Sequence, residues 1–480
     1  MQKFLAKLDS FFKISERGST VKTEIVAGLT TFFAMAYIVM VNPNSVAGSS
    51  LDQLAGDLKT VWLSVYVASI LAAVVGTLLY AFYAKLPFAQ ACGMGLNSFF
   101  FVSFILPQLL TPGGDVIEGY REGLCIILIS GLLFLILSVT GARQYIAKAL
   151  PDCLKKAIPA GIGLFIAFIG FKNAGIIQDN QYTFVQFFDF KGAISGKSFI
   201  EGWRAIAPVV LALLGLFLIA VLNKKNVKGS IIISILSVSV LYYLTTWTLP
   251  SFNLGHIGDS FKAFGTEGLF GAFKGFGVFA GGLAALVQAI VLVITFTLVD
   301  MFDTIGTLYG TASQADMLDE NGDPININAA MTSDSIATLS GAVFGTSTCT
   351  TFVESASGVA AGGRTGLASV VTALCFAVCL FLSPVAAIIP SCATAPALTF
   401  VGVLMLKSFS KVDMEDMRSA VPAFLALIMM PLTYSISNGI AIGAIAYTII
   451  TLATGKYTKK DIVVTIIAVL FTLRFFLVTM

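Results

Sequence analysis

The feature that most constrains this chain is a series of fourteen apolar stretches, most of them long enough to cross a bilayer as helices. They fall into two sets of seven. The first set covers about 24–42, 61–83, 91–107, 123–141, 157–176, 205–222 and 229–248, and the second about 276–311, 332–345, 346–363, 367–387, 391–408, 420–436 and 438–454. We therefore predict an all-α polytopic membrane protein with fourteen membrane-spanning segments.

The composition indicates that most of the surface of this chain is in contact with lipid rather than with water. Hydrophobic residues make up 57% of the 480 residues and charged residues 11%. In a water-soluble domain, roughly a quarter of the residues are charged. The net charge is +3, and no basic run with interleaved aromatic residues indicates a nucleic-acid partner. The seven cysteines show no zinc-type spacing with a histidine. We expect them to be small core residues, and we expect neither a metal nor a cofactor.

The distribution of lysine and arginine sets the expected orientation. With the N-terminus in the cytoplasm, 20 of the 29 basic residues lie on the cytoplasmic side, eight lie outside, and Arg474 is the remainder. The charged N-terminal segment does not read as a cleavable signal peptide. We therefore expect a multi-pass protein of the cell membrane. A homodimer is compatible with this sequence.

Three pairs of segments, in the same order in both sets, indicate an internal repeat. The segment Cys92–Ser98 resembles Cys349–Ser355 at an offset of 257, Pro151–Cys153 resembles Pro390–Cys392 at 239, and the stretch from Ala207 resembles that from Val421 at 214. The offsets shrink as they would if the loop 177–204 were an insertion in the first half. Because seven is odd, the second set must enter the membrane in the opposite direction, as in many secondary transporters.

This repeat divides the chain into three parts. Residues 1–248 form the first inverted repeat and residues 274–455 the second. The remaining residues, 456–480, form an apolar tail that carries Arg474 near its middle and follows Lys456, Lys459 and Lys460. A buried arginine is costly in a membrane, so we expect this tail to lie along the cytoplasmic interface rather than to cross.

Three acids lie deep within the predicted spans, where a charge is costly and therefore indicates function. Asp300 and Asp303 are three residues apart and share one helix face, and Thr307 lies one turn beyond Asp303. Glu354 lies in GTSTCTTFVESASGVAAGG, which is too polar and rich in glycine for a helix that faces lipid. Its counterpart in the first set, QACGMGLNSFF, contains the amide of Asn97.

These residues predict two short segments that meet near the middle of the bilayer and point their free backbone groups at a small polar solute. Thr351, Phe352 and Gly95 are the expected supporting positions. A structural alternative stays open, in which the acids and Asn97 only bond to neighbouring helices. His256, the only histidine, lies in a predicted outside loop. Any proton coupling is therefore assigned to Asp303 and Glu354.

Four motifs in this order make the sequence resemble a known family. They are VKTEIVAGLTTFFAMAYIVMVNP, ACGMGLNSFF, VDMFDTIGTLYG and GTSTCTTFVESASGVAAGGRTGL. Together they resemble the AzgA-like purine permeases, the hypoxanthine, guanine and adenine branch of the nucleobase:cation symporter-2 family. The resemblance covers about residues 11–455.

The resemblance implies a fold in which a core domain, about 22–142 and 276–387, moves like an elevator against a gate domain, about 151–248 and 391–455. It also implies that the third and tenth segments are half strand and half helix. Asp303 and Glu354 match the family's substrate-binding carboxylates, and Asp300 and Asn97 match further binding positions. Many relatives in the wider family have a histidine where this chain has Thr307.

The function that the resemblance implies is import of purine nucleobases by proton symport. Carboxylates suit this substrate, because one carboxylate accepts two N–H donors from a purine edge. An anion transporter of similar fold would need a cation at the broken segments, which carry acids here. An intramembrane enzyme with paired carboxylates is the other alternative, although catalytic aspartate pairs sit on separate helices rather than three residues apart.

Overall fold

The structure, a computed structural model, describes residues 2–141, 151–227, 229–250, 252–314, 317–318 and 324–477, apart from some side chains in these ranges. Within these residues, eight helical segments are long and apolar enough to cross a membrane. They are Val21–Gln53, Gly56–Ala84, Val116–Val139, Asp152–Asn173, Phe199–Lys224, Gly282–Ile305, Ser391–Lys411 and Ile436–Ala453. Shorter apolar helical segments cover Met94–Leu110, Ser230–Thr246, Gly366–Cys379, Met417–Leu432 and Ile462–Leu473.

The elements follow one another with short 3-10 or π turns between some of them. Up to residue 248 they are α1 Gln2–Phe12, α2 Val21–Met35, α3 Ile38–Ala47, α4 Gly56–Leu79, β1 Gln90–Cys92, α5 Met94–Phe100, α6 Leu106–Leu110, α7 Val116–Val139, α9 Asp152–Asn173, β2 Ile177–Asn180, β3 Phe184–Phe187, α10 Phe190–Ile194, α11 Phe199–Lys224 and α12 Ser230–Thr246. After it they are α13 Gly255–Ala263, α14 Gly282–Gln314, α15 Ile327–Phe344, β4 Cys349–Thr351, α16 Ser355–Ala360, α17 Gly366–Cys379, α18 Ser383–Ala387, α19 Ser391–Leu406, α20 Met417–Leu432, α21 Ile436–Ala453 and α22 Ile462–Leu477.

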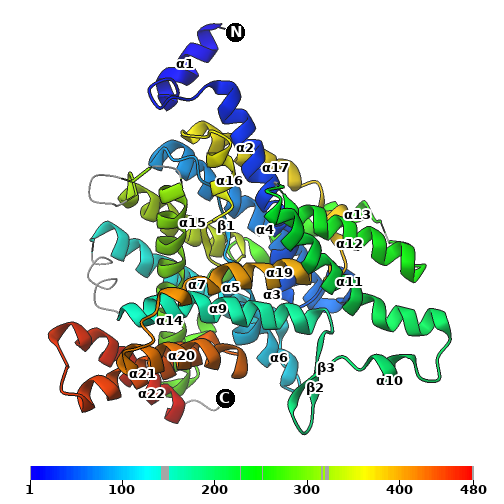
Figure 1. Ribbon diagram of the computed structural model, residues 1–480, viewed down its shortest axis with the longest axis vertical. Coiled ribbons are helices and arrows are strands. Elements are labelled where there is room, and N and C mark those ends of the chain that lie inside the picture. The colour runs from blue at the N-terminus through cyan, green and yellow to red at the C-terminus, as the bar shows by residue number, and fades with distance from the viewer. Residues whose placement is uncertain are drawn as a thin grey trace.

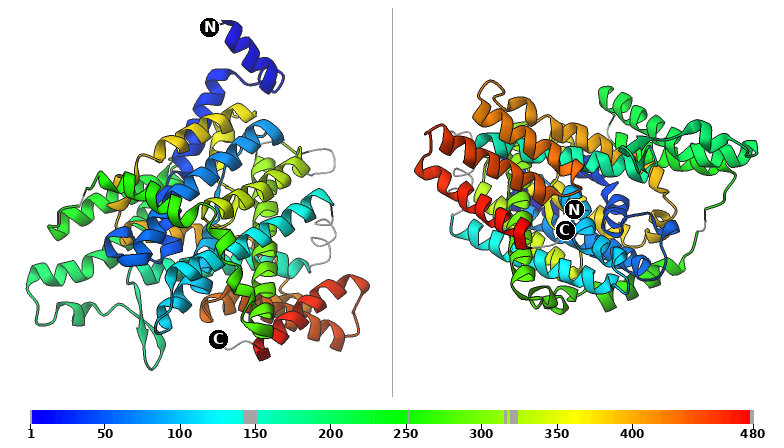
Figure 2. Two further views of the ribbon diagram at one scale, coloured as in Figure 1. Left: turned by 180° about the vertical axis from the view of Figure 1, so that it is seen from behind. Right: turned by 90° about the horizontal axis from the view of Figure 1, so that it is seen from below.

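The helices pack in two groups. The first group consists of α2–α7 with α14–α17, and the second of α9, α11 and α12 with α19–α21. Figure 1 shows β1 near the middle of the molecule, α1 projecting at the top, and α20–α22 together at the lower left. The views in Figure 2 show the β2–β3 hairpin and α10 at the edge of the molecule. The sequence predicts only an inserted loop over 177–204, so this hairpin was not predicted.

The first predicted span, 24–42, is broken rather than continuous. It consists of α2 and α3, which meet at Ala36 and Tyr37. The break is made by tighter hydrogen bonds, from Val39 N to Ala36 O at 3.3 Å and from Met40 N to Tyr37 O at 3.1 Å. As a result, Tyr37 stands at a junction between two helices and not within a regular helix.

The second helix group has its closest approach where α9 crosses α19. A Cβ atom added to Gly163 would lie 2.8 Å from the carbonyl oxygen of Gly402, and a Cβ on Gly402 would clash with the carbonyl oxygen of Gly163. Glycine is therefore required at both positions, as is usual where helices cross closely in a membrane. These two residues are 239 positions apart, which is the offset between the fifth segments of the two sets.

A two-stranded antiparallel ribbon joins the two halves of the chain. Strand β1 pairs with β4 in the register Gln90↔Thr351, Ala91↔Thr350 and Cys92↔Cys349. The backbone bonds from Gly93 N to Thr348 O and from Phe352 N to Ala89 O, both 3.0 Å, extend the pairing at each end. Each strand leads into a short helix, α5 or α16, so both segments that the sequence predicts to be broken have the strand–helix form.

The ribbon register makes a testable prediction about the two cysteines that pair at one end of the strands. Because the flanking pairs carry the backbone hydrogen bonds, Cys92 and Cys349 form a non-hydrogen-bonded pair, in which side chains are closest. Their sulfurs are 3.7 Å apart. A membrane-permeant dithiol oxidant should therefore link Cys92 to Cys349, which mass spectrometry of proteolytic peptides detects. The Cys92→Ser variant should lose this linked peptide, and a link from Cys92 to another cysteine would contradict the register.

Candidate functional site

The two faces of the β1–β4 ribbon have different surroundings. The side chains of Gln90, Cys92, Cys349 and Thr351 face α4 and α15, where the two cysteines pack with Ala72 and Ala337. The opposite face carries Gly93 and Thr350 and is turned to α14. A Cβ atom on Gly93 would lie 3.9 Å from Oδ2 of Asp303, and the hydroxyls of Thr304 and Thr350 are 3.0 Å apart. The ribbon thus lies between two polar regions, which Thr304 connects because its hydroxyl also donates to Asp334.

Asp303 and Glu354 lie on the α14 side of the ribbon. The carboxylate of Glu354, at the start of α16, accepts a hydrogen bond of 2.6 Å from the hydroxyl of Tyr37. The helix α16, which begins after Glu354, contacts α14, which carries Asp303. Within the described residues, no side chain donates to the Asp303 carboxylate. The structure therefore brings together the two acids that the sequence assigned to substrate and proton.

Asn97 is a second polar side chain of the candidate site. It lies on α5 and is fully buried, and neither its amide nitrogen nor its carbonyl oxygen has a hydrogen-bond partner among the described residues. Buried amides are nearly always bonded to protein, to water or to a ligand. Gly95, two residues before it, lets α5 approach α9, since a Cβ there would clash with Ile162. These features leave Asn97 available to a solute.

The other expected residues have structural contacts. The hydroxyl of Thr307 donates to the backbone oxygen of Asp303 at 2.9 Å, so it bonds the helix rather than the carboxylate. Phe352 contributes a ribbon backbone bond, and the hydroxyl of Thr351 donates to Asp334 at 3.3 Å. Asp300 is buried and accepts a 2.8 Å hydrogen bond from Thr338, while its other carboxylate oxygen has no partner among the described residues.

The prediction of three acids deep within the spans missed two further acids that are buried. Asp334 lies within the predicted span 332–345, and Glu24 lies at the start of the span 24–42; both are fully buried. Their letters were visible in the sequence. Their buried partners were not, because these partners come from distant segments of the chain.

Asp334 connects both strands of the ribbon to α15. One carboxylate oxygen accepts from the side-chain amide of Gln90 at 2.5 Å and from Thr351 at 3.3 Å, and the other accepts from Thr304. Gln90 and Thr351 are register partners, so a single carboxylate holds opposite residues of β1 and β4. Charge-assisted hydrogen bonds of this kind are stronger than neutral ones. Asp334 therefore stabilises the ribbon from the side that faces α15.

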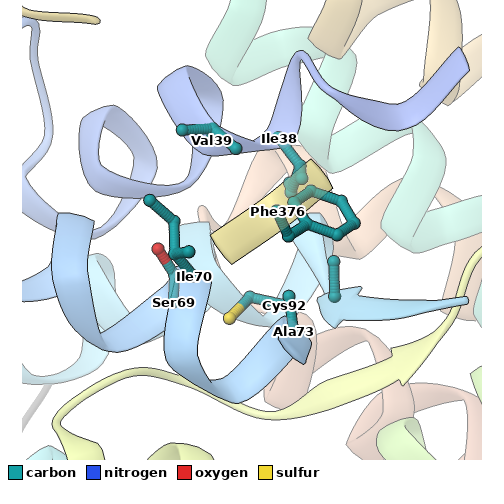
Figure 3. A pocket seen from close by; sticks show the side chains of 8 residues that line it. Ile38, Val39, Ser69, Ile70, Ala73, Cys92 and Phe376 are labelled. Carbon is teal, nitrogen blue, oxygen red and sulfur yellow. The ribbon is translucent and has the colours of Figure 1, made fainter. Parts of the chain in front are cut away.

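A narrow apolar pocket between α3, α4, β1 and α17 is separate from these carboxylates (Figure 3). It is lined by Ile38, Val39, Ser69, Ile70, Ala73, Ala91, Cys92 and Phe376. Its polar side chains are those of Ser69 and Cys92, and the Ser69 hydroxyl already donates to the Tyr66 carbonyl at 3.1 Å. This lining cannot bind a row of N–H donors, so we place the candidate site at the α14 face of the ribbon.

Comparison with known proteins identifies the family. The chain matches the permease family Xan_ur_permease over residues 22–442. This chain belongs to that permease family. It is 38% identical to the guanine/hypoxanthine permease PbuO of Bacillus subtilis, across 97% of this chain and 100% of the relative. It is 34% identical to the adenine permease AdeQ of Escherichia coli, across 98% of this chain and 96% of the relative. The resemblance inferred from the four motifs is confirmed.

Solved structures show the same fold at low sequence identity. The transmembrane domain of the cyanobacterial bicarbonate transporter BicA matches with a TM-score of 0.59 at 13% identity, across 87% of this permease and 97% of that chain. The murine anion transporter Slc26a9 matches with a TM-score of 0.62 at 12% identity, across 94% and 72%. This permease is therefore a mostly helical, polytopic membrane protein. Its family and its relatives are named permeases, so it is a transporter rather than an intramembrane enzyme.

The contacts of Asp334 predict a stability difference between two neutral substitutions. Asp334→Asn turns an amide toward donors that need a carboxylate, and we expect it to lower the free energy of unfolding by ~1.5–3 kcal/mol. Asp303→Asn is the matched control, because no described side chain donates to that carboxylate. Tryptophan fluorescence during thermal unfolding of the detergent-solubilised proteins measures both. An equal fall in the two unfolding midpoints would show that Asp334 does not hold the ribbon.

Proposed function

We propose that this permease imports purine nucleobases, guanine and hypoxanthine foremost and adenine as well, in symport with protons. The observation that carries the proposal is the pair Asp303 and Glu354 on one face of the ribbon. One oxygen of Glu354 is held by Tyr37, and no other described residue donates to the second. That oxygen is thus available to the N–H donors of a purine. The named functions of the relatives PbuO and AdeQ support this substrate class.

The proposed roles divide the site residues. Glu354 accepts N–H groups of the purine, Asp303 carries the coupled proton, and Asp300 and Asn97 are further binding positions, each with a polar atom that lacks a partner among the described residues. Transfer of a proton with each neutral purine makes import electrogenic. A membrane potential then adds ~2.3 kcal/mol per charge per 100 mV, which suffices for accumulation.

The proposed membrane arrangement is fourteen segments in two inverted repeats, 1–248 and 274–455, with the N-terminus in the cytoplasm and the protein in the cell membrane. Two contacts between equivalent residues of the repeats support it, Cys92 with Cys349 and Gly163 with Gly402. When two halves are related by a two-fold axis, equivalent residues touch each other only close to that axis. The packing of α9 on α20 and α21 is matched by that of α19 on α11 and α12.

The proposed transport movement follows from this arrangement. The core, about 22–142 and 276–387, carries the ribbon and the acids, and it moves as an elevator against the gate, about 151–248 and 391–455. The contact of Gly95 with Ile162 lies between these two parts. A homodimer that anchors the gate is part of the proposal.

An anion transporter is the second candidate, because BicA and Slc26a9 share the fold. The face of the ribbon argues against it. Two carboxylates there would repel an anion, whereas they attract N–H donors and protons.

The direct test is uptake of labelled hypoxanthine by proteoliposomes with an imposed proton gradient. We expect accumulation above the external concentration, competition by guanine and adenine but not by uracil, and collapse on addition of a protonophore. Equilibration without accumulation would indicate a channel, and uptake of bicarbonate without purine would indicate an anion transporter. Either result would contradict the proposal.

Two neutral substitutions should separate binding from coupling. Glu354→Gln keeps the shape but loses the charge, and we expect it to weaken purine binding by ~1.5–3 kcal/mol. Asp303→Asn should still exchange labelled for unlabelled purine, yet fail to accumulate it, because the coupled proton has no carrier. Binding titration and paired exchange and uptake assays measure these effects. Undiminished concentrative uptake by Asp303→Asn would exclude its role in coupling.

The C-terminal segment 456–480 is proposed to lie along the cytoplasmic interface. The start of α22 is held near the end of α21 by a 3.0 Å hydrogen bond from Tyr447 to Asp461, and Val464 and Phe471 pack inward. The side chain of Arg474 lies outside the described residues. A reporter fused after Met480 should be labelled only from the cytoplasm. Labelling from outside the cell would mean that the segment crosses the membrane.

A further inference from the structure

The half-helix that carries Glu354 is packed directly on α2. A Cβ atom on Gly358 of α16 would clash with the hydroxyl of Thr31 and lie 2.7 Å from the backbone oxygen of Ala27. Farther along, a Cβ on Gly363 would lie 2.8 Å from the Ala27 side chain. The segment therefore packs closely on α2, with only the small side chains of Thr31 and Ala27 between them.

Glu24 attaches α2 to the far end of the α16 segment. Its two carboxylate oxygens accept the backbone N–H groups of Arg364 at 2.8 Å and Thr365 at 3.2 Å. Arg364 in turn donates to the carbonyl oxygens of Val359 and Gly363, both at 2.8 Å, near the end of α16. A cation there also complements the negative end of the helix dipole. These hydrogen bonds attach this end of the segment to α2 and give partners to the backbone N–H and carbonyl groups named above.

Tyr37 makes the corresponding attachment at the near end. It follows α2 at the α2–α3 break, is fully buried, and donates its hydroxyl to Glu354 at 2.6 Å. The bond is charge-assisted when the carboxylate is ionised and therefore stronger than a neutral one. Glu24, on α2, thus holds one end of the segment 354–365, and Tyr37, at the α2–α3 junction, holds the other end.

We propose that Tyr37 is a positioning residue for the transport site, which holds one carboxylate oxygen of Glu354 so that the other is presented to the purine. This inference rests on the proposed function. A glutamate side chain has three rotatable bonds, and its ordering on binding would weaken affinity. A tyrosine hydroxyl that already fixes the carboxylate removes this cost before the substrate arrives. The α2–α3 break places the ring where it can do so.

The test compares Tyr37→Phe with Tyr66→Phe. Tyr66 is the matched control, because it is also fully buried and donates a 2.6 Å hydrogen bond, but to the backbone oxygen of Cys379. With purified protein and labelled hypoxanthine, Tyr37→Phe should weaken binding about tenfold, the loss typical of one hydrogen bond to a charged group. In proteoliposomes the KM should rise by a similar factor while the maximal rate is retained. Tyr66→Phe should leave both constants within about twofold of the wild type, although its unfolding midpoint falls at least as much.

The double variant Tyr37→Phe/Glu354→Gln shows whether Tyr37 acts through Glu354. We expect it to bind purine no more weakly than Glu354→Gln alone. Wild-type affinity in Tyr37→Phe, an equal loss in Tyr66→Phe, or a further tenfold loss in the double variant would each overturn the role of Tyr37. Failure of the wild-type protein to bind any purine would instead overturn the proposed function itself.

Discussion

The pairing of β1 with β4 is the interaction on which the rest of the structure depends. Extended backbone inside a bilayer has no water to satisfy its N–H and C=O groups, and each unpaired group costs several kcal/mol. Here the two short strands, from opposite halves of the chain, satisfy each other. Neither half can therefore build its broken segment alone. The two must be brought together by packing of the helices around them before either strand is stable.

The ribbon also explains why this permease tolerates so many acids in a small volume. Asp334, on α15, accepts hydrogen bonds from Gln90, Thr351 and Thr304 on its two carboxylate oxygens and serves the structure. Asp303 and Glu354 lie on the α14 side with fewer protein donors. We infer that acids whose acceptors are filled by protein donors stabilise the scaffold, whereas acids with spare acceptors remain open to the proposed substrate. The same residue type thus has two roles, and the difference lies in which face of the ribbon it occupies.

Several features could be predicted from the sequence because they depend on local composition and spacing. The polar, glycine-rich stretches around Cys92 and Cys349 indicated broken segments, and their offset of 257 made these two cysteines equivalent positions, which the structure pairs in the ribbon. The offset of 239 likewise matches the contact of Gly163 with Gly402. The β2–β3 hairpin and the break at Tyr37 were not predicted, because the apolar pattern continues through 24–42 and a polar insertion has no strong period.

What the sequence by itself determined is the class of protein, the number of apolar stretches and the identity of the acids. Hydrophobicity and charge are properties of the residues, and they decide what a bilayer accepts without reference to any contact. Only the tertiary structure decided how those acids are used. Tyr37 and Glu354 are 317 positions apart, and Gln90 and Asp334 are 244 apart. No local pattern records such pairs, because each hydrogen bond exists only after α2, α15 and the two halves of the ribbon have packed together.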